Sequence, residues 1–337
     1  MKFSTNDIHQ QTKDISMKNT EFLSNLSTAD AKKLRDRIRE TKINVLLVGG
    51  TGVGKSSTIN ALFDSQGMDN RAKVGDSTKP ETMEIDSYEM ENLIIWDTPG
   101  LGDSIEKDAT HKIKISEILR RKDANGQPLI DLVFLILDSS SRDFSSAFTL
   151  IEKVILPNLI EGDRDRLLIG LNRADNAMSG HFWNKSENRP EQKLIERLEE
   201  QVKTVSERIK ADTGLDIEPI YYSAGCEIDG EILSHPYNLQ KLLSFIMDRL
   251  PKKKRAAIAM HINENEANFR SNDEKADYAE KIEKSIFDSV TYWIKDVIGD
   301  VAGQVGSMVK TVVTDPKNIK IAAGWAFSAI TAFLKKK

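Results

Sequence analysis

Residues 49–56, Gly-Gly-Thr-Gly-Val-Gly-Lys-Ser, have the residue types and the spacing of a loop that binds phosphate groups. Backbone N–H groups in such a glycine-rich turn point inward and form a nest for an anion. The ammonium group of Lys55 would reach the β- and γ-phosphates of a nucleotide, and the hydroxyl of Ser56 would bind Mg²⁺. This pattern predicts a polyphosphate site.

The segments on both sides of the loop support this prediction. Residues 43–48 form an apolar run that predicts a buried strand. Residues 55–64 predict the first turns of a helix, whose dipole adds partial positive charge where the phosphates would lie. The predicted contacts of the nucleotide in this region are Gly50, Thr51, Gly52, Val53, Gly54, Lys55, Ser56 and Ser57.

A second polar motif, Asp97-Thr98-Pro99-Gly100, follows the apolar run 93–96. A carboxylate at the end of a buried strand, here Asp97, is placed to hold Mg²⁺ through water. The N–H group of Gly100 can contact the γ-phosphate and so report its presence. The two motifs together predict a nucleoside triphosphate and a magnesium ion.

The base is predicted by a third motif, Asn172-Arg173-Ala174-Asp175, which follows the apolar run 167–171. The carboxylate of Asp175 can accept hydrogen bonds from the N1–H and the 2-amino group of guanine. Adenine has no donor at either place, so a buried Asp175 beside it would be left unpaired. The motif therefore favours GTP over ATP.

A further loop completes the predicted base site. The strand predicted at 217–222 ends in Ser223-Ala224-Gly225, where the N–H group of Ala224 is placed to meet the guanine O6. All four motifs follow predicted strands, so they would meet at one edge of a parallel sheet.

The order of the predicted elements indicates the fold class. Strands alternate with helices, which predicts an α/β fold with a doubly wound, mostly parallel, six-stranded sheet and a ligand at the carboxyl ends of the strands. Residues 83–89 and 93–97 are joined by a short turn, so that pair should be antiparallel. The segment 179–190 contains no predicted element. Strands are predicted at 43–48, 83–89, 93–97, 131–138, 166–172 and 217–222, and helices near 55–64, 110–122, 144–156, 191–212 and 237–250.

These motifs resemble those of the P-loop GTPases of the Ras-like superclass. The chain is similar to the Era-like and septin-like branches, and most of all to bacterial YfjP-like proteins, whose domain is called a 50S ribosome-binding GTPase. The resemblance covers roughly residues 42–250 and is specific for GTP binding rather than for a cellular role. It is carried by residues 45–63, by Asp97-Thr98-Pro99-Gly100-Leu101-Gly102, by Asn172-Arg173-Ala174-Asp175, and by Trp183, Asn188, Pro190, Glu191 and Gln192 in the insert that follows.

The resemblance implies a threonine that closes over the magnesium ion when GTP is bound. Residues 74–85 offer two, and Thr82 is favoured over Thr78 because it directly precedes the strand that begins at residue 83. The predicted magnesium ligands are then Ser56, Thr82 and Asp97, and the predicted catalytic groups are Lys55, Thr82 and Gly100.

Two departures from the family pattern predict slow hydrolysis. Many relatives have glutamine at the position of Leu101, where it orients the attacking water, and leucine cannot form that hydrogen bond. Thr51 occupies the loop position nearest the γ-phosphate, where a glycine would leave room for an arginine from an activating protein. Stimulation is therefore expected by another route, such as pairing of two G domains across their nucleotide faces.

Two further departures concern the base. Arg173 stands where lysine is usual, and a guanidinium can stack along the nucleotide at least as well as an ammonium group. Gly225 stands where lysine is common, which bears on affinity rather than on specificity.

The composition agrees with a cytoplasmic protein. The 337 residues carry a net charge of −4, so no DNA partner is expected, whereas a ribosomal or RNA partner is left open. One cysteine, Cys226, rules out an internal disulfide, and it is expected to be a partly buried small residue. The first residues contain no apolar core of the kind that a secretory signal has.

Three segments are predicted: an N-terminal helical extension (1–41), the G domain (42–250) and a C-terminal helical region (251–337). Residues 256–298 are expected to be helical. The tail 317–337 ends in three lysines after a stretch rich in alanine and aromatic residues. It suits an amphipathic helix on an anionic membrane surface, and it suits equally a helix packed in the protein's own core.

Two functions stay open at this point. One is a GTPase with slow intrinsic turnover, stimulated by self-association or a partner, whose tail couples hydrolysis to a membrane or to assembly. The other is a GTP-loaded module that recruits a partner and has negligible turnover.

Overall fold

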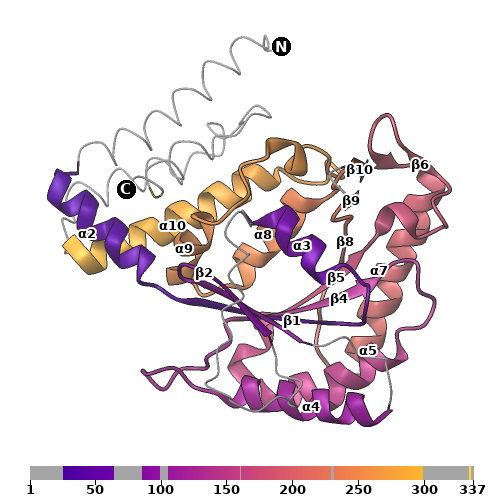
Figure 1. The fold of residues 1–337 in the computed structure, drawn as a ribbon, viewed down its shortest axis with the longest axis horizontal. Coiled ribbons are helices and arrows are strands. Elements are labelled where there is room, and N and C mark those ends of the chain that lie inside the picture. Colours follow the sequence, from indigo (N-terminus) through magenta and orange to yellow (C-terminus); the bar gives the residue numbers. More distant parts are fainter. Residues whose placement is uncertain are drawn as a thin grey trace. The chain divides into compact units, whose positions relative to one another are not determined.

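The computed structural model describes residues 26–63, 86–98, 105–159, 161–228, 231–298 and 334 (Figure 1). The chain divides into two compact units. The larger unit consists of residues 43–250 and 261–274, and the smaller unit contains the rest of the described chain. The segment 261–274 thus belongs to the larger unit, although its neighbours on both sides in the sequence do not.

The larger unit is built on a six-stranded sheet with the strand order β2-β3-β1-β4-β5-β8. All neighbouring strands are parallel except β2 and β3, which pair antiparallel as predicted. The predicted fold class is confirmed. The strands are β1 (Ile43–Gly49), β2 (Asp86–Met90), β3 (Leu93–Asp97), β4 (Leu132–Asp138), β5 (Leu167–Asn172) and β8 (Ile220–Tyr221).

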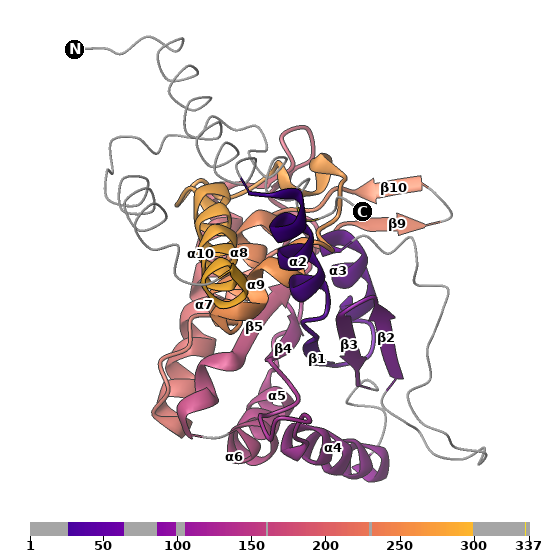
Figure 2. The same cartoon turned by 90° about the vertical axis from the view of Figure 1, so that its left-hand side faces the viewer.

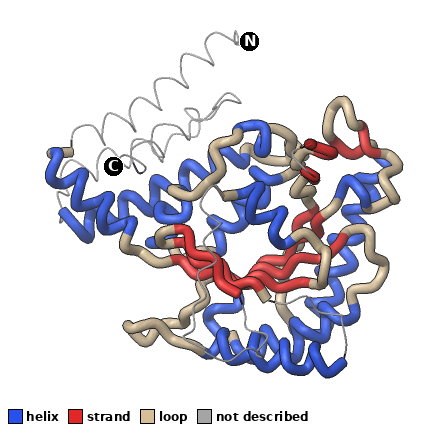
Figure 3. Tube along the Cα trace, viewed as in Figure 1, coloured by secondary structure: helices blue, strands red, loops and turns tan. Residues whose placement is uncertain are grey.

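The central strands consist mostly of apolar residues because helices cover both faces of the sheet (Figure 3). Every residue of β1 and of β5 is buried. The register pairs Leu47 with Asp97 and Gly49 with Ile136, so β1, β3 and β4 end at the same edge. The motifs that follow these strands therefore start close together.

The helices of this unit lie close to their predicted positions. The predicted helix 144–156 is divided into α5, a π-helical turn at Ile151–Ile155 and α6, which has Pro157 in its first turn. The α-helices are α3 (Lys55–Leu62), α4 (Ile105–Arg120), α5 (Ser145–Leu150), α6 (Leu156–Asn158), α7 (Gln192–Thr213) and α8 (Leu239–Arg249), with 3-10 turns at Glu161–Arg166, Ala174–Asn176 and Glu266–Phe269.

Two small hairpins lie beside the sheet. One is formed by β6 (Trp183–Asn184) and β7 (Arg189–Pro190), so the prediction that 179–190 contains no element was wrong. A strand of two residues is too short to give a recognisable hydrophobic pattern in the sequence. The other hairpin is formed by β9 (Cys226–Ile228) and β10 (Glu231–Ser234) (Figure 2).

The segment 261–274 packs on α3 through asparagine side chains. Asn263 Nδ2 donates to Asn60 O at 2.9 Å, and Asn268 Nδ2 donates to Ala61 O at 3.0 Å. These bonds satisfy carbonyl groups that the end of a helix leaves without partners. Asparagine side chains compete with a helix for backbone hydrogen bonds. The prediction of continuous helix over 256–298 was therefore wrong in this segment.

The smaller unit is helical in the part that the structure describes. It contains α2 (Thr28–Arg39), a 3-10 turn (Lys252–Lys254), α9 (Arg255–Ala259) and α10 (Tyr278–Ile298). Within this unit Ser289 Oγ accepts a hydrogen bond from the Ala256 N–H at 3.0 Å, which holds α9 to α10. Of the tail 317–337, the structure describes only Leu334, which is buried. The two interpretations of the tail therefore stay open.

None of the described helices is both long enough and apolar enough to cross a membrane.

Candidate nucleotide-binding site

A cavity of about 520 Å³ lies where the predicted motifs meet. Three predicted segments contribute to its wall, although they are far apart in the sequence. From the phosphate loop come Gly52, Gly54 and Ser57, from the base motif Asn172, Arg173 and Asp175, and from the last loop Ser223 and Gly225. The β6–β7 insert and the β9–β10 hairpin add Trp183, Lys185, Asn188, Cys226, Leu233 and His235.

Gly54 fixes the shape of the phosphate loop at the start of α3. It has a left-handed backbone, with φ of 88°. A Cβ atom at this position would lie 2.3 Å from Asn172 Nδ2, so only glycine fits both the conformation and the space. Lys55 Nζ donates to Gly49 O and Gly50 O at 3.3 and 3.2 Å, and thus lies across the loop.

Asn172 ties the phosphate loop to the last loop of the site. Its Nδ2 donates to Val53 O at 2.8 Å, and its Oδ1 accepts a hydrogen bond from the Ala224 N–H at 3.0 Å. The amide group thus bridges two loops that the sequence separates widely. The Ala224 N–H already has this partner, so its contact with the guanine O6 stays a prediction.

Asp175 is held in place by its neighbour in space, Ser223. Ser223 Oγ donates to Asp175 Oδ1 at 2.7 Å. The backbone of Ser223 is held in turn by an antiparallel bridge to Tyr237, with N···O distances of 3.0 and 2.9 Å. The carboxylate that would read the base is therefore oriented before any ligand binds.

Arg173 lies at the wall of the cavity with a left-handed backbone, φ of 62°. Its guanidinium forms an ion pair with Asp138 at the end of β4, with an Nη1–Oδ2 distance of 2.8 Å. The Arg173 side chain is 45% exposed, so this pair adds little stability. Stacking of Arg173 along a nucleotide stays a prediction.

Packing explains why Gly225 is not a lysine. Its φ is 75°, and a Cβ atom would lie 2.8 Å from Ser234 O at the end of the β9–β10 hairpin. Cys226, the next residue, is exposed and lines the cavity, so the expectation that it is partly buried was wrong.

The predicted magnesium ligands are described only in part. Ser56 is exposed in the first turn of α3, and Asp97 ends β3 beside Leu47 of β1. A hydroxyl and a carboxylate at neighbouring strand ends fit Mg²⁺, which prefers oxygen ligands. Thr82, its alternative Thr78, Gly100 and Leu101 lie outside the described residues.

Tyr222 is a residue of the site's framework that the sequence did not indicate. Thr58 Oγ1 donates to Gly54 O at 2.7 Å, so the Tyr222 hydroxyl is the donor in its 2.8 Å contact with Thr58 Oγ1. The Tyr222 carbonyl also accepts the Ala174 N–H at 3.0 Å. One fully buried residue thus bonds to both the phosphate-loop helix and the base motif.

Glycine at position 170 makes room for this tyrosine. A Cβ atom on Gly170 would lie 2.7 Å from Tyr222 Cε1 and 2.8 Å from Phe134 Cε2. Burial raises the pKa of Tyr222 well above its ordinary value, so the phenol remains a donor at neutral pH. No local sequence pattern connects Tyr222 with Thr58, which lies 164 residues away.

Tyr222→Phe should lower the free energy of unfolding by about 1 kcal/mol, because one buried hydrogen bond is lost. It should also weaken GDP binding several-fold, because the turn that carries Lys55 loses a contact to the base loop. Denaturant unfolding and GDP titration measure the two effects. Tyr292→Phe, at an exposed residue of α10, is the control. Unchanged GDP affinity in Tyr222→Phe would show that the contact is structural only.

The fold and the site together define a P-loop nucleotide-binding domain. Residues 44–173 match the family described as 50S ribosome-binding GTPase. This segment is therefore a P-loop GTPase domain. This match does not distinguish one branch of the family from another, so the resemblance to the YfjP-like branch stays a prediction.

Several curated proteins are similar over parts of this domain. "Translocase of chloroplast 108, chloroplastic" from Physcomitrium patens is 36% identical over 104 residues, which cover 30% of this chain and 10% of that protein. "Septin-12" from Rattus norvegicus is 36% identical over 75 residues, covering 20% and 21%. "Probable GTP-binding protein EngB" from Leptospira biflexa is 29% identical over 168 residues, covering 48% and 73%. The chain thus spans only about a tenth of the length of the translocase.

A solved structure of Toc33 from Arabidopsis thaliana in complex with GDP and Mg²⁺ is similar at 16% sequence identity. The TM-score is 0.40, and the match covers 67% of this chain and 94% of that chain.

Proposed function

We propose that this chain binds GTP and GDP with Mg²⁺ and hydrolyses GTP to GDP and phosphate. The observation that carries the proposal is the hydrogen-bonded connection between the phosphate loop and the base loops, made by Asn172 and by Tyr222. A glycine turn alone would not require these connections. A site that must hold phosphates and a base at a fixed separation does require them.

Guanine selectivity rests on Asp175. Ser223 holds one carboxylate oxygen, and Asp175 lines the cavity beside the glycines of the phosphate loop. Magnesium, when bound, would neutralise charge on the phosphates. Ser56, Asp97 and a threonine of the segment 74–85 would hold it.

We further propose that intrinsic turnover is slow and rises when two copies, or the chain and a partner, come together. The reasons are the leucine at position 101 and the threonine at position 51, which is exposed in the phosphate loop. Coupling of the tail 317–337 to an anionic membrane or to assembly, and a cytoplasmic location, belong to the same proposal. The second candidate is a GTP-loaded recruitment module with negligible turnover.

GTP turnover per protein molecule should rise with protein concentration when Mg²⁺ is present. Self-association would supply groups that the isolated site lacks, so specific activity depends on how much of the protein is paired. Phosphate release measured over a wide range of protein concentration tests this, and EDTA should abolish it. Slow turnover that does not change with concentration would favour the recruitment module, and absence of GTP binding would contradict both functions.

A further inference from the structure

A second cavity, of about 440 Å³, lies in the same unit beside the nucleotide site. Its wall is formed by the β6–β7 insert, the start of α7, the end of β8 and the segment 272–274. The volume is within the range of roughly 300–1,000 Å³ that is common for small-molecule sites. The function proposed above does not use this cavity.

Two buried tyrosines, Tyr221 and Tyr237, line this cavity. Each residue is only 3% exposed. Within the described part of the chain, neither phenol oxygen has a hydrogen-bond partner. The two phenol oxygens are not fully enclosed, so each hydroxyl is free to form a hydrogen bond with water or with a polar ligand in the cavity.

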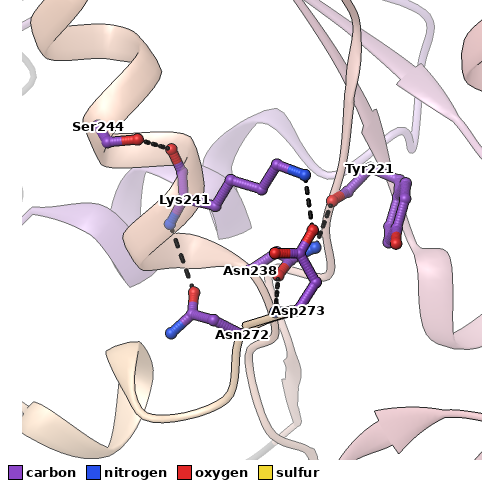
Figure 4. A network of polar contacts seen from close by, with 6 residues as sticks. All are labelled: Tyr221, Asn238, Lys241, Ser244, Asn272 and Asp273. Carbon is purple, nitrogen blue, oxygen red and sulfur yellow. Dashed lines mark hydrogen bonds and ion pairs between the residues drawn. The ribbon is translucent and has the colours of Figure 1, made fainter. Parts of the chain in front are cut away.

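The charges around the tyrosines are mainly negative, although Arg189, which is paired with Glu187, also lines the cavity. Asp273 is paired with Lys241 at an Nζ–Oδ2 distance of 2.6 Å, and Figure 4 shows this ion pair beside the Tyr221 side chain. The same view shows no contact from the Tyr221 hydroxyl to the other residues drawn. The cavity is also lined by Glu191 and Glu274, which have no ion-pair partner among the described residues.

Burial, followed by the negative charge of Asp273, raises the pKa of Tyr221 well above its ordinary value. Burial also raises the pKa of Tyr237, with a smaller contribution from its neighbour Tyr221. Both phenols therefore stay neutral at pH 7, and the lone pairs of their oxygens are available to a hydrogen-bond donor. Two phenol oxygens and two unpaired carboxylates match a ligand that carries N–H donors and positive charge.

The two cavities share a wall. The ring of Tyr237 forms a T-shaped contact with Trp183, which lines the nucleotide cavity, at a centroid distance of 5.3 Å. The Tyr237 backbone pairs with Ser223, and the Ser223 hydroxyl holds Asp175. A ligand that restrains Tyr237 would therefore restrain the group that reads the base.

We propose that this second cavity binds a small organic cation with an ammonium or guanidinium group, and that the bound cation slows release of the guanine nucleotide. The effect on nucleotide release rests on the proposed function. Binding of the cation does not, because the cation would bind to the chain without nucleotide.

Agmatine, which carries both groups, should bind to the full-length chain without nucleotide, as measured by calorimetry. Tyr237→Phe and Glu274→Gln should each weaken this binding about tenfold, because each removes a hydrogen bond or a charge that faces the ligand. Glu117→Gln on α4, at an exposed residue that lines neither cavity, should bind agmatine like the unchanged protein. No agmatine binding, or equal binding by all variants, would overturn the proposed site.

A tripeptide with a central arginine distinguishes the source of the cation. Weaker binding of the tripeptide than of agmatine supports a free small ligand. Tighter binding overturns that choice and assigns the cavity to a side chain of a partner protein.

Release of a fluorescent GDP analogue tests the coupling. Agmatine should slow its release several-fold from the unchanged protein and from Glu117→Gln, but not from Tyr237→Phe. If agmatine binds and the release rate does not change, the coupling is wrong. If the GDP analogue never binds, the proposed function fails, while the calorimetric result still decides whether the cation site exists.

Discussion

Gly54→Ala should weaken GDP binding by at least about 10²-fold and lower the free energy of unfolding by about 2–4 kcal/mol. Two effects add at this position. The left-handed backbone, φ of 88°, disfavours any residue with a Cβ atom, and that atom would lie 2.3 Å from Asn172 Nδ2. Asn172 would have to move, and its bonds to Val53 O and to the Ala224 N–H would be lost together.

Gly214→Ala separates these effects. Gly214 ends α7 with φ of 73°, and a Cβ atom there would meet nothing within 4 Å. This variant should lose about 1 kcal/mol through backbone strain alone and should bind GDP normally. Denaturant unfolding and GDP titration of both variants provide the comparison. Equal GDP affinities in the two variants would contradict the role given to the contact between Gly54 and Asn172.

Asp175→Asn should weaken GTP and GDP binding by roughly 10²–10⁴-fold, because two charged hydrogen bonds to the base are lost. It should also admit xanthosine nucleotides. Ser223 Oγ donates to Asp175 Oδ1, so the oxygen of the new amide would keep that place. The NH₂ group would then face the base, where it can donate to the 2-oxo group of xanthine but not to the 2-amino group of guanine.

Asp216→Asn provides the control for loss of one carboxylate. Asp216 lies in the loop before β8, and its side chain is 77% exposed. That variant should keep guanine affinity and should not bind xanthosine diphosphate. Competition between guanosine and xanthosine diphosphates measures both variants. If Asp175→Asn kept the preference for guanine, the base would be read elsewhere in the cavity.

The sequence by itself determined the fold class and the motifs of the site. Apolar runs at 43–48 and 93–96 are long enough to predict strands, and the polar residues after each run mark its carboxyl end. The order of these short patterns then predicts a parallel sheet with its ligand at one edge. Such features can be predicted because each depends on residues that are neighbours in the sequence.

The tertiary structure decided the contacts that hold these motifs in register. Tyr222 and Thr58 are 164 residues apart, and Asn172 and Val53 are 119 apart. Hydrophobic periodicity describes one helix or strand at a time, so it contains no information about which side chains meet between elements. The same reason explains why the need for glycine at position 225 could not be predicted.

The segment 261–274 and the second cavity depend wholly on folding. Asn263 and Asn268 lie in a segment that the sequence predicted to be helical, and only packing brings them to the carbonyl groups at the end of α3. Tyr221 and Tyr237 gain a shared cavity only because the bridge between Ser223 and Tyr237 brings them together. The sequence determined the local chemistry of phosphate and base recognition. The tertiary structure decided how the separate loops are joined, because long-range packing selects those contacts.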